Sequence, residues 1–301
     1  MTSRGDSPRI RWLALVAGAA VVLTGVLAPV RGPAPGPGAA LADVASRCAR
    51  TSKPYSVGTT TIGVSSRGRT LTTTVSYPAA SAGSGTRAAC GRFPLVVVAH
   101  GSQGTGASAA GLHAYLARNG YILASPTFPA STDMTGAARD VSAIISRVRG
   151  LSRHGDLPFS GRVRGSKVGF IGTSMGAMIG LSLFRRCCRE PRVNAVIAKL
   201  GSAFGTGYRW AAGPPLLMIN GTADDVVPYQ DALNTYRRAK RPKGLVTLAG
   251  IGHDLLTGSD PILTEATLGF FARYLRHARG GLRRVTRAAA RSPIATLRSI
   301  W

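Results

Sequence analysis

Acidic side chains are scarce in this chain, which has 12 Asp and Glu against 38 Lys and Arg and a formal net charge of +26. Aromatic residues make up only 6% of the sequence, and no nucleic-acid recognition motif is present, so the basic charge does not indicate a nucleic acid partner. Two interpretations of the charge stay open. It reflects either a compositional preference for arginine that also favours solubility, or attraction to an anionic surface or polymer.

Cysteine is also rare, with four residues at positions 48, 90, 187 and 188. No cysteine pair has the ligand spacing of a metal site with a second pair or a nearby pair of histidines, so we do not expect a metal site. Cys48 and Cys90 flank the first predicted hairpin, and in an oxidising compartment a disulfide between them could link its two ends. The neighbours Cys187 and Cys188 are not expected to bond each other easily without strain. Four cysteines allow three pairings, and the sequence alone does not choose among them.

The first 42 residues have the pattern of a secretory signal peptide. Three arginines precede an uncharged run over 12–30, and the segment ends in the small-x-small sequence Ala40-Leu41-Ala42. This predicts a secreted, extracellular or cell-envelope-associated protein. The alternative is an uncleaved membrane anchor, because the apolar run is near the threshold of roughly 18 residues for a membrane span.

The remaining sequence alternates between strand and helix patterns. Thr and Val alternate over 56–64 and 70–77 on either side of a Ser/Gly-containing turn, which predicts an antiparallel hairpin. Predicted strands follow at 94–99, 121–125, 168–171, 194–200, 215–220 and 245–248, and predicted helices at 108–118, 135–149, 229–239 and 262–277. The alternation predicts one α/β domain over 43–278, with a mostly parallel central sheet and helices on both faces. The short connection 201–214 leaves no room for a large cap domain.

The C-terminal segment 279–301 differs in composition from the domain that precedes it. From Arg276 to Trp301 there are seven arginines and no acidic residue, and Gly280-Gly281 interrupts the chain. We expect a basic C-terminal tail that is disordered and solvated. The alternative is an amphipathic basic helix over 282–290 on an anionic membrane or envelope surface.

One motif stands out within the predicted sheet. The apolar run 168–171 meets Gly172-Thr173-Ser174-Met175-Gly176, and a helix-compatible run follows at once. In a Gly-x-Ser-x-Gly turn between strand and helix, the serine has a strained backbone, and larger residues at the two glycines would clash. The N–H of Met175 then points to where an oxyanion would develop. Ser174 is therefore a candidate nucleophile.

An acid and a histidine follow in the expected order. Asp224 comes after the predicted strand 215–220, and His253 lies in a Gly-rich loop after the last predicted strand. The order Ser, Asp, His is the one found when such a triad occurs on an α/β-hydrolase sheet. Asp225 is the rival to Asp224 as the acid. Of the other histidines, His100 is better suited to support a nearby loop than to act as a base.

On these motifs the chain resembles secreted α/β-hydrolases of the dienelactone-hydrolase-like, platelet-activating-factor-acetylhydrolase-like and polyester-hydrolase-like group. The resemblance covers about residues 55–275. It rests on His100-Gly101-Ser102, on the Gly-x-Ser-x-Gly turn at Ser174 (the nucleophile elbow), on the turn after Gly221 and on Gly252-His253. It implies Asp224 as the acid, the backbone N–H of Ser102 as the second oxyanion donor, and a serine esterase or lipase activity. Serine chemistry of this kind requires no cofactor, so we do not expect one. True dienelactone hydrolases have cysteine at the elbow, which argues against that activity here.

The sequence is compatible with three functions. The first is hydrolysis of carboxylic esters, with Phe204 in the short loop 201–214 as a candidate pocket residue. The second is peptide hydrolysis of the prolyl-oligopeptidase type, although no propeller sequence precedes the domain. The third is a non-catalytic envelope-binding protein on the same fold, which would have no need of an intact triad.

Overall fold

The protein is described by a computed structural model that covers residues 48–129, 133–203, 210, 212–254 and 260–301. The predicted signal peptide and Phe204 lie outside these residues. Among the helices in the described part of the chain, none is long and apolar enough to cross a membrane.

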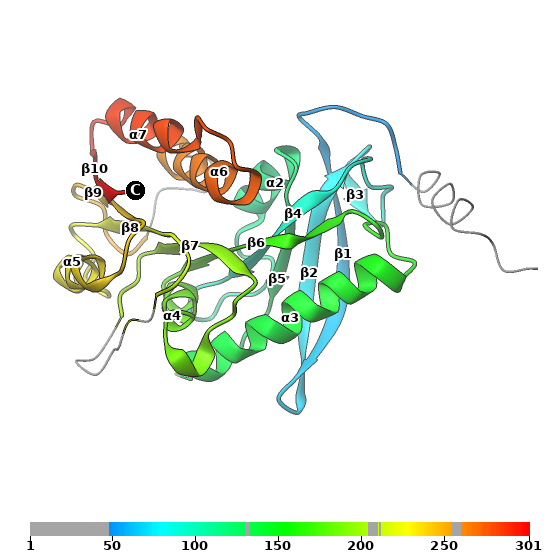
Figure 1. Ribbon diagram of the computed structural model, residues 1–301, viewed down its shortest axis with the longest axis horizontal. Coiled ribbons are helices and arrows are strands. Elements are labelled where there is room, and N and C mark those ends of the chain that lie inside the picture. Colours follow the sequence, from blue (N-terminus) through cyan, green and yellow to red (C-terminus); the bar gives the residue numbers. More distant parts are fainter. Residues whose placement is uncertain (1–47, 130–132, 204–209, 211, 255–259) are drawn as a thin grey trace, which may run out of the picture.

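The centre of the molecule is a ten-stranded, mostly parallel mixed sheet (Figure 1). Its order is β10-β9-β8-β7-β6-β4-β5-β2-β1-β3. The run from β9 to β5 is parallel, β2 pairs with β5 and β1 antiparallel, and β10 pairs with β9 antiparallel. The strands are β1 (Ser56–Ser66), β2 (Arg69–Ala79), β3 (Gly83–Ser84), β4 (Phe93–Ala99), β5 (Ile122–Pro126), β6 (Val163–Thr173), β7 (Val193–Lys199), β8 (Leu216–Gly221), β9 (Lys243–Leu248) and β10 (Ala295–Ile300).

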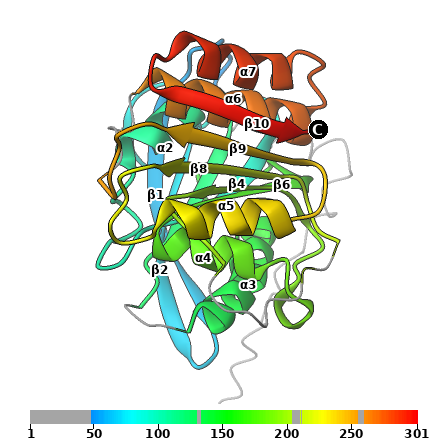
Figure 2. The ribbon, with the colours of Figure 1, turned by 90° about the vertical axis from the view of Figure 1, so that its left-hand side faces the viewer.

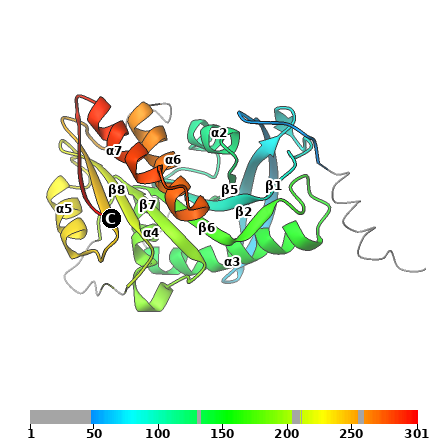
Figure 3. The same ribbon diagram turned by 45° about the horizontal axis from the view of Figure 1, so that its top comes forward.

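Helices cover both faces of the sheet. In Figures 2 and 3, α2, α6 and α7 lie on one side of the strands and α3, α4 and α5 on the other. They span α2 (Ala110–Arg118), α3 (Met134–His154), α4 (Met175–Ser182), α5 (Tyr229–Arg238), α6 (Pro261–Arg276) and α7 (Gly281–Arg291). Each face carries its own hydrophobic core. All seven residues of β4 are buried, as expected for a strand that is covered on both faces.

The predicted elements agree with the structure in type and nearly in extent. The hairpin formed by β1 and β2 is antiparallel and pairs Ser56 with Ala79 and Ser66 with Arg69. The largest extension is that of β6, which spans Val163–Thr173 rather than 168–171. Helix α3 also runs past 149 to His154, and its apolar spacing continues there because Leu151 packs against the core.

The C-terminal segment differs from the solvated tail that we expected. It forms α7 and then β10, which pairs antiparallel with β9 from Ala295 opposite Leu248 to Ile300 opposite Lys243. The physical reason is an apolar face in the basic helix, where Val285, Ala288 and Ala289 are buried in the core shared with α6. The segment is therefore part of the α/β domain, and the domain extends beyond residue 278.

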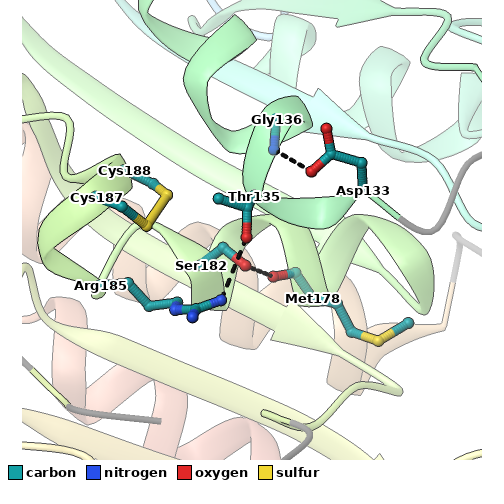
Figure 4. Close-up of a disulfide and its surroundings, with 8 residues drawn as sticks. All are labelled: Asp133, Thr135, Gly136, Met178, Ser182, Arg185, Cys187 and Cys188. Carbon is teal, nitrogen blue, oxygen red and sulfur yellow. Dashed lines mark hydrogen bonds between the residues drawn. A yellow bond between two sulfur atoms is a disulfide. The ribbon is translucent and has the colours of Figure 1, made fainter. Parts of the chain in front are cut away.

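The described cysteines form two disulfides. Cys48 joins Cys90, as the hairpin-stapling prediction suggested, with a Cα–Cα distance of 5.0 Å. Cys187 also joins Cys188, contrary to the expectation that these neighbours would not bond each other. Figure 4 shows this second bond just after α4, near Arg185, whose guanidinium donates to Thr135 Oγ1 of α3 at 3.2 Å. Both cysteines lie in a short 3-10 turn over Arg186–Cys188.

Candidate active site

Ser174 lies on a sharp turn between β6 and α4. Its backbone has φ 54° and ψ −114°, a conformation that a residue with a side chain rarely adopts. The flanking glycines make this turn possible. A Cβ on Gly172 would lie 2.1 Å from the Gly176 carbonyl oxygen, and one on Gly176 would lie 2.2 Å from the Ala99 carbonyl oxygen. The turn is thus packed between neighbouring backbones with no space for side chains at either position.

The serine, the histidine and one carboxylate form a continuous hydrogen-bonded chain. His253 Nε2 lies 2.9 Å from Ser174 Oγ, and His253 Nδ1 lies 2.9 Å from both carboxylate oxygens of Asp224. Because a carboxylate only accepts, Nδ1 carries the proton and Nε2 is free to accept from the Ser174 hydroxyl. Three residues that are far apart in the sequence are therefore brought together at the carboxyl ends of β6, β8 and β9.

The structure distinguishes Asp224 from its neighbour. The Asp224 side chain is fully buried, and its Oδ1 also accepts from the N–H groups of Val226 and Val227 at 3.0 and 2.7 Å. These bonds fix the carboxylate in the orientation that meets His253. Asp225 is exposed, as expected for a turn residue that faces solvent. Asp224 is the acid in contact with the histidine.

The loop after β4 lies against the elbow. A Cβ on Gly101 would lie 3.6 Å from Ser174 Cβ, so the backbone next to Ser102 approaches the serine closely. His100 holds this loop, because its Nε2 accepts from the Phe128 N–H at 2.8 Å and its Nδ1 lies 2.7 Å from the Gly101 carbonyl oxygen. Met175 is the first residue of α4, where N–H groups have no acceptor within the helix.

The remaining polar candidates lie elsewhere. Asp140 is buried in α3, where its carboxylate accepts a hydrogen bond from Ser66 Oγ at 2.6 Å and forms an ion pair with Arg69. Its role is therefore structural, since it joins α3 to the hairpin of β1 and β2. His113 of α2 is buried against Ser125, with 3.0 Å between its Nε2 and Ser125 Oγ. His277 ends α6. Within the described residues, no group of three or more His, Cys, Asp or Glu is arranged to hold a metal.

Lys199 is a residue near the site that sequence reasoning missed. It is the last residue of β7, and its backbone carbonyl accepts the Ser174 N–H at 2.8 Å, which helps to hold the elbow. Its side chain is only 8% exposed, and burial lowers the pKa of its amine to about 8. The one available signal was a lone lysine at the end of an otherwise apolar strand sequence.

Comparison with known proteins leaves the family open. No family model matches the chain, and no curated protein matches it.

Proposed function

We propose that this protein is a serine hydrolase of the α/β-hydrolase fold that cleaves carboxylic esters through an acyl-enzyme. The observation that carries the proposal is the unbroken contact from Ser174 Oγ through the His253 ring to Asp224. The strained φ of 54° at Ser174 supports it, because strain of this kind is kept mainly where it serves a function.

The proposed reaction is acyl transfer in two halves. Ser174 Oγ attacks the ester carbonyl while His253 Nε2 takes its proton, and the Asp224 carboxylate stabilises the imidazolium. His253 then gives that proton to the departing alcohol oxygen. A water molecule attacks the acyl-enzyme in the second half of the cycle, with His253 again as the base, and releases the carboxylic acid.

The backbone N–H groups of Ser102 and Met175 are the proposed donors to the oxyanion. Two observations support this assignment. The backbone at Gly101 approaches Ser174, and Met175 is the first residue of α4, where N–H groups have no acceptor within the helix. A single oxyanion donor typically contributes about 100- to 1000-fold to the rate. The proposal needs no cofactor.

We further propose that the protein acts after export. The disulfide between Cys48 and Cys90 supports this, since such bonds persist in oxidising compartments, and so does the signal-like sequence over 1–42.

The proposal is tested by hydrolysis of p-nitrophenyl butyrate. The protein should turn over the ester, and Ser174→Ala should lose this turnover while keeping its melting temperature. Ser182→Ala is a matched control, because this serine lies on α4 and its hydroxyl donates a hydrogen bond to the Met178 carbonyl rather than to a member of the triad. Turnover by Ser174→Ala at the level of the unmodified protein would refute the assignment, and a preference for peptide substrates would favour the peptidase alternative.

A further inference from the structure

A cavity lies beneath the loop that follows β4. It has a volume of about 250 Å³, is partly open to solvent, and lies between the ends of β4, β6 and β7, the start of α2 and the first turn of α6. Its apolar part includes Leu112, Ile171 and Leu263. Its polar part includes Lys199, Thr173 and Ser108. Ser108 and Gly111 are exposed, so the cavity has a rim on the molecular surface.

Lys199 is without a counter-charge in this cavity. Among the described residues, the Lys199 amine has no hydrogen bond or ion pair. Burial lowers the pKa of this amine from 10.5 to about 8. The amine is therefore mostly charged at pH 7. A buried ammonium without a partner costs several kcal/mol, so a structure that keeps one gains by binding an anion beside it.

The titratable groups around the cavity are all basic. His113 faces Lys199 from α2, and burial together with the charge of Lys199 lowers its pKa to about 4, so it is neutral at pH 7. His100 accepts the Phe128 N–H through Nε2, which also requires a neutral ring. No acidic residue is among the described residues that line the cavity.

A hydroxyl also lines the cavity, at its rim. Ser108 Oγ accepts the Thr105 N–H at 2.7 Å, and a hydroxyl that accepts one hydrogen bond still has its own proton to donate. A ligand that satisfies this lining has one small anionic end for the amine and hydroxyl, and a short apolar end for the aliphatic wall.

We propose that the cavity binds a short aliphatic carboxylate, with its anionic end on Lys199 and its alkyl chain against Leu112, Ile171 and Leu263. The binding does not depend on the proposed hydrolysis. It would nevertheless place a ligand directly behind the loop of Gly101 and Ser102, and beside the strand end that holds Ser174.

The experiment measures binding of sodium butyrate by calorimetry at pH 6.5, with sodium sulfate keeping the ionic strength constant. The unmodified protein should bind butyrate, and Lys199→Met should bind it at least tenfold more weakly. Lys243→Met is the matched control, because Lys243 is equally buried but donates to the carbonyls of Tyr236 and Arg237 and lies outside the cavity. Unchanged butyrate affinity in Lys199→Met would overturn the proposal.

Two further measurements use the unmodified protein and so do not depend on a variant that folds. Butyramide, which has the same shape without the charge, should bind at least tenfold more weakly than butyrate. Butyrate affinity should also fall at least tenfold at pH 9.5, where the Lys199 amine is neutral. Equal affinity for butyrate and butyramide, or an affinity that is independent of pH, would overturn the assignment, and chloride binding as tight as butyrate would exclude the apolar wall as part of the site.

Discussion

At the scale of single residues, the candidate site depends on two kinds of constraint. Close backbone packing fixes Ser174, since neither Gly172 nor Gly176 has room for a Cβ. Hydrogen bonds fix the other two members, because Asp224 is held by the N–H groups of its own turn and in turn orients His253. Each constraint acts on a short motif, although the backbone that excludes a Cβ at Gly176 belongs to β4. The motifs themselves were therefore sufficient to locate the residues.

The two neighbouring acids should behave differently when their charge is removed. We expect Asp224→Asn to reduce kcat for p-nitrophenyl butyrate by on the order of 10⁴-fold, because an amide holds the wrong histidine tautomer. Asp225→Asn should leave kcat within about twofold, since Asp225 is exposed. Steady-state kinetics on the two variants measures both effects, and equal activities would show that the acid is wrongly assigned.

The elbow glycines should be intolerant of alanine. In Gly172→Ala the new Cβ would lie 2.1 Å from a backbone oxygen, so we expect loss of several kcal/mol of stability, seen as a large fall in melting temperature. Gly111→Ala is the control, because apart from its chain neighbours and the nearby backbone of α2, no atom lies within 4 Å of its Cβ position. That change should raise stability by up to about 1 kcal/mol. Similar melting temperatures for the two variants would contradict the packing argument.

At the scale of secondary structure, elements with strong internal patterns were predictable. The buried runs at β4 and β6 and the alternating hairpin of β1 and β2 were found because each pattern is complete within a few residues. The outcome for α7 and β10 was not predictable from charge. Their position depends on whether the β9 edge is open to pairing and on the fit of Val285 against α6, and both are properties of the assembled sheet.

The C-terminal elements should therefore contribute to stability. A protein ending at residue 278 would expose the β9 edge and the surface of α6 that Val285 covers, so we expect a clearly lower melting temperature. Arg298→Gln in the full chain is the control, because this residue is exposed on β10 and should leave stability within about 0.5 kcal/mol. An unchanged melting temperature for the shortened protein would restore the solvated-tail interpretation.

At the scale of the whole molecule, buried basic groups make stability depend on pH. Burial lowers the pKa of His113 from 6.5 to about 4, so the unfolded chain binds the proton more readily than the folded one. The contribution of the neutral histidine is present above pH 6.5 and is lost as pH falls toward 4. We expect His113→Asn to flatten this part of the curve of unfolding free energy against pH, and an unchanged slope would contradict it.

The pairing of distant residues is also a property of the whole molecule. The order of Ser174, Asp224 and His253 along the chain predicted a triad, and the parallel sheet explains the prediction, because β6, β8 and β9 end at one edge. The buried Lys199 was not predicted as a site residue. Its significance depends on a cavity that forms only when α2 and α6 close over the sheet.

The most direct test of the proposed nucleophile is labelling with a fluorophosphonate, followed by mass spectrometry of the peptides. We expect one adduct, on the peptide that contains Ser174, formed by the native protein and absent after heat denaturation. Ser174→Ala should not be labelled, and His253→Ala should be labelled far more slowly, because the base that activates the hydroxyl is missing. Absence of an adduct on the native protein, or an adduct on another residue, would contradict the assignment of Ser174 as the nucleophile.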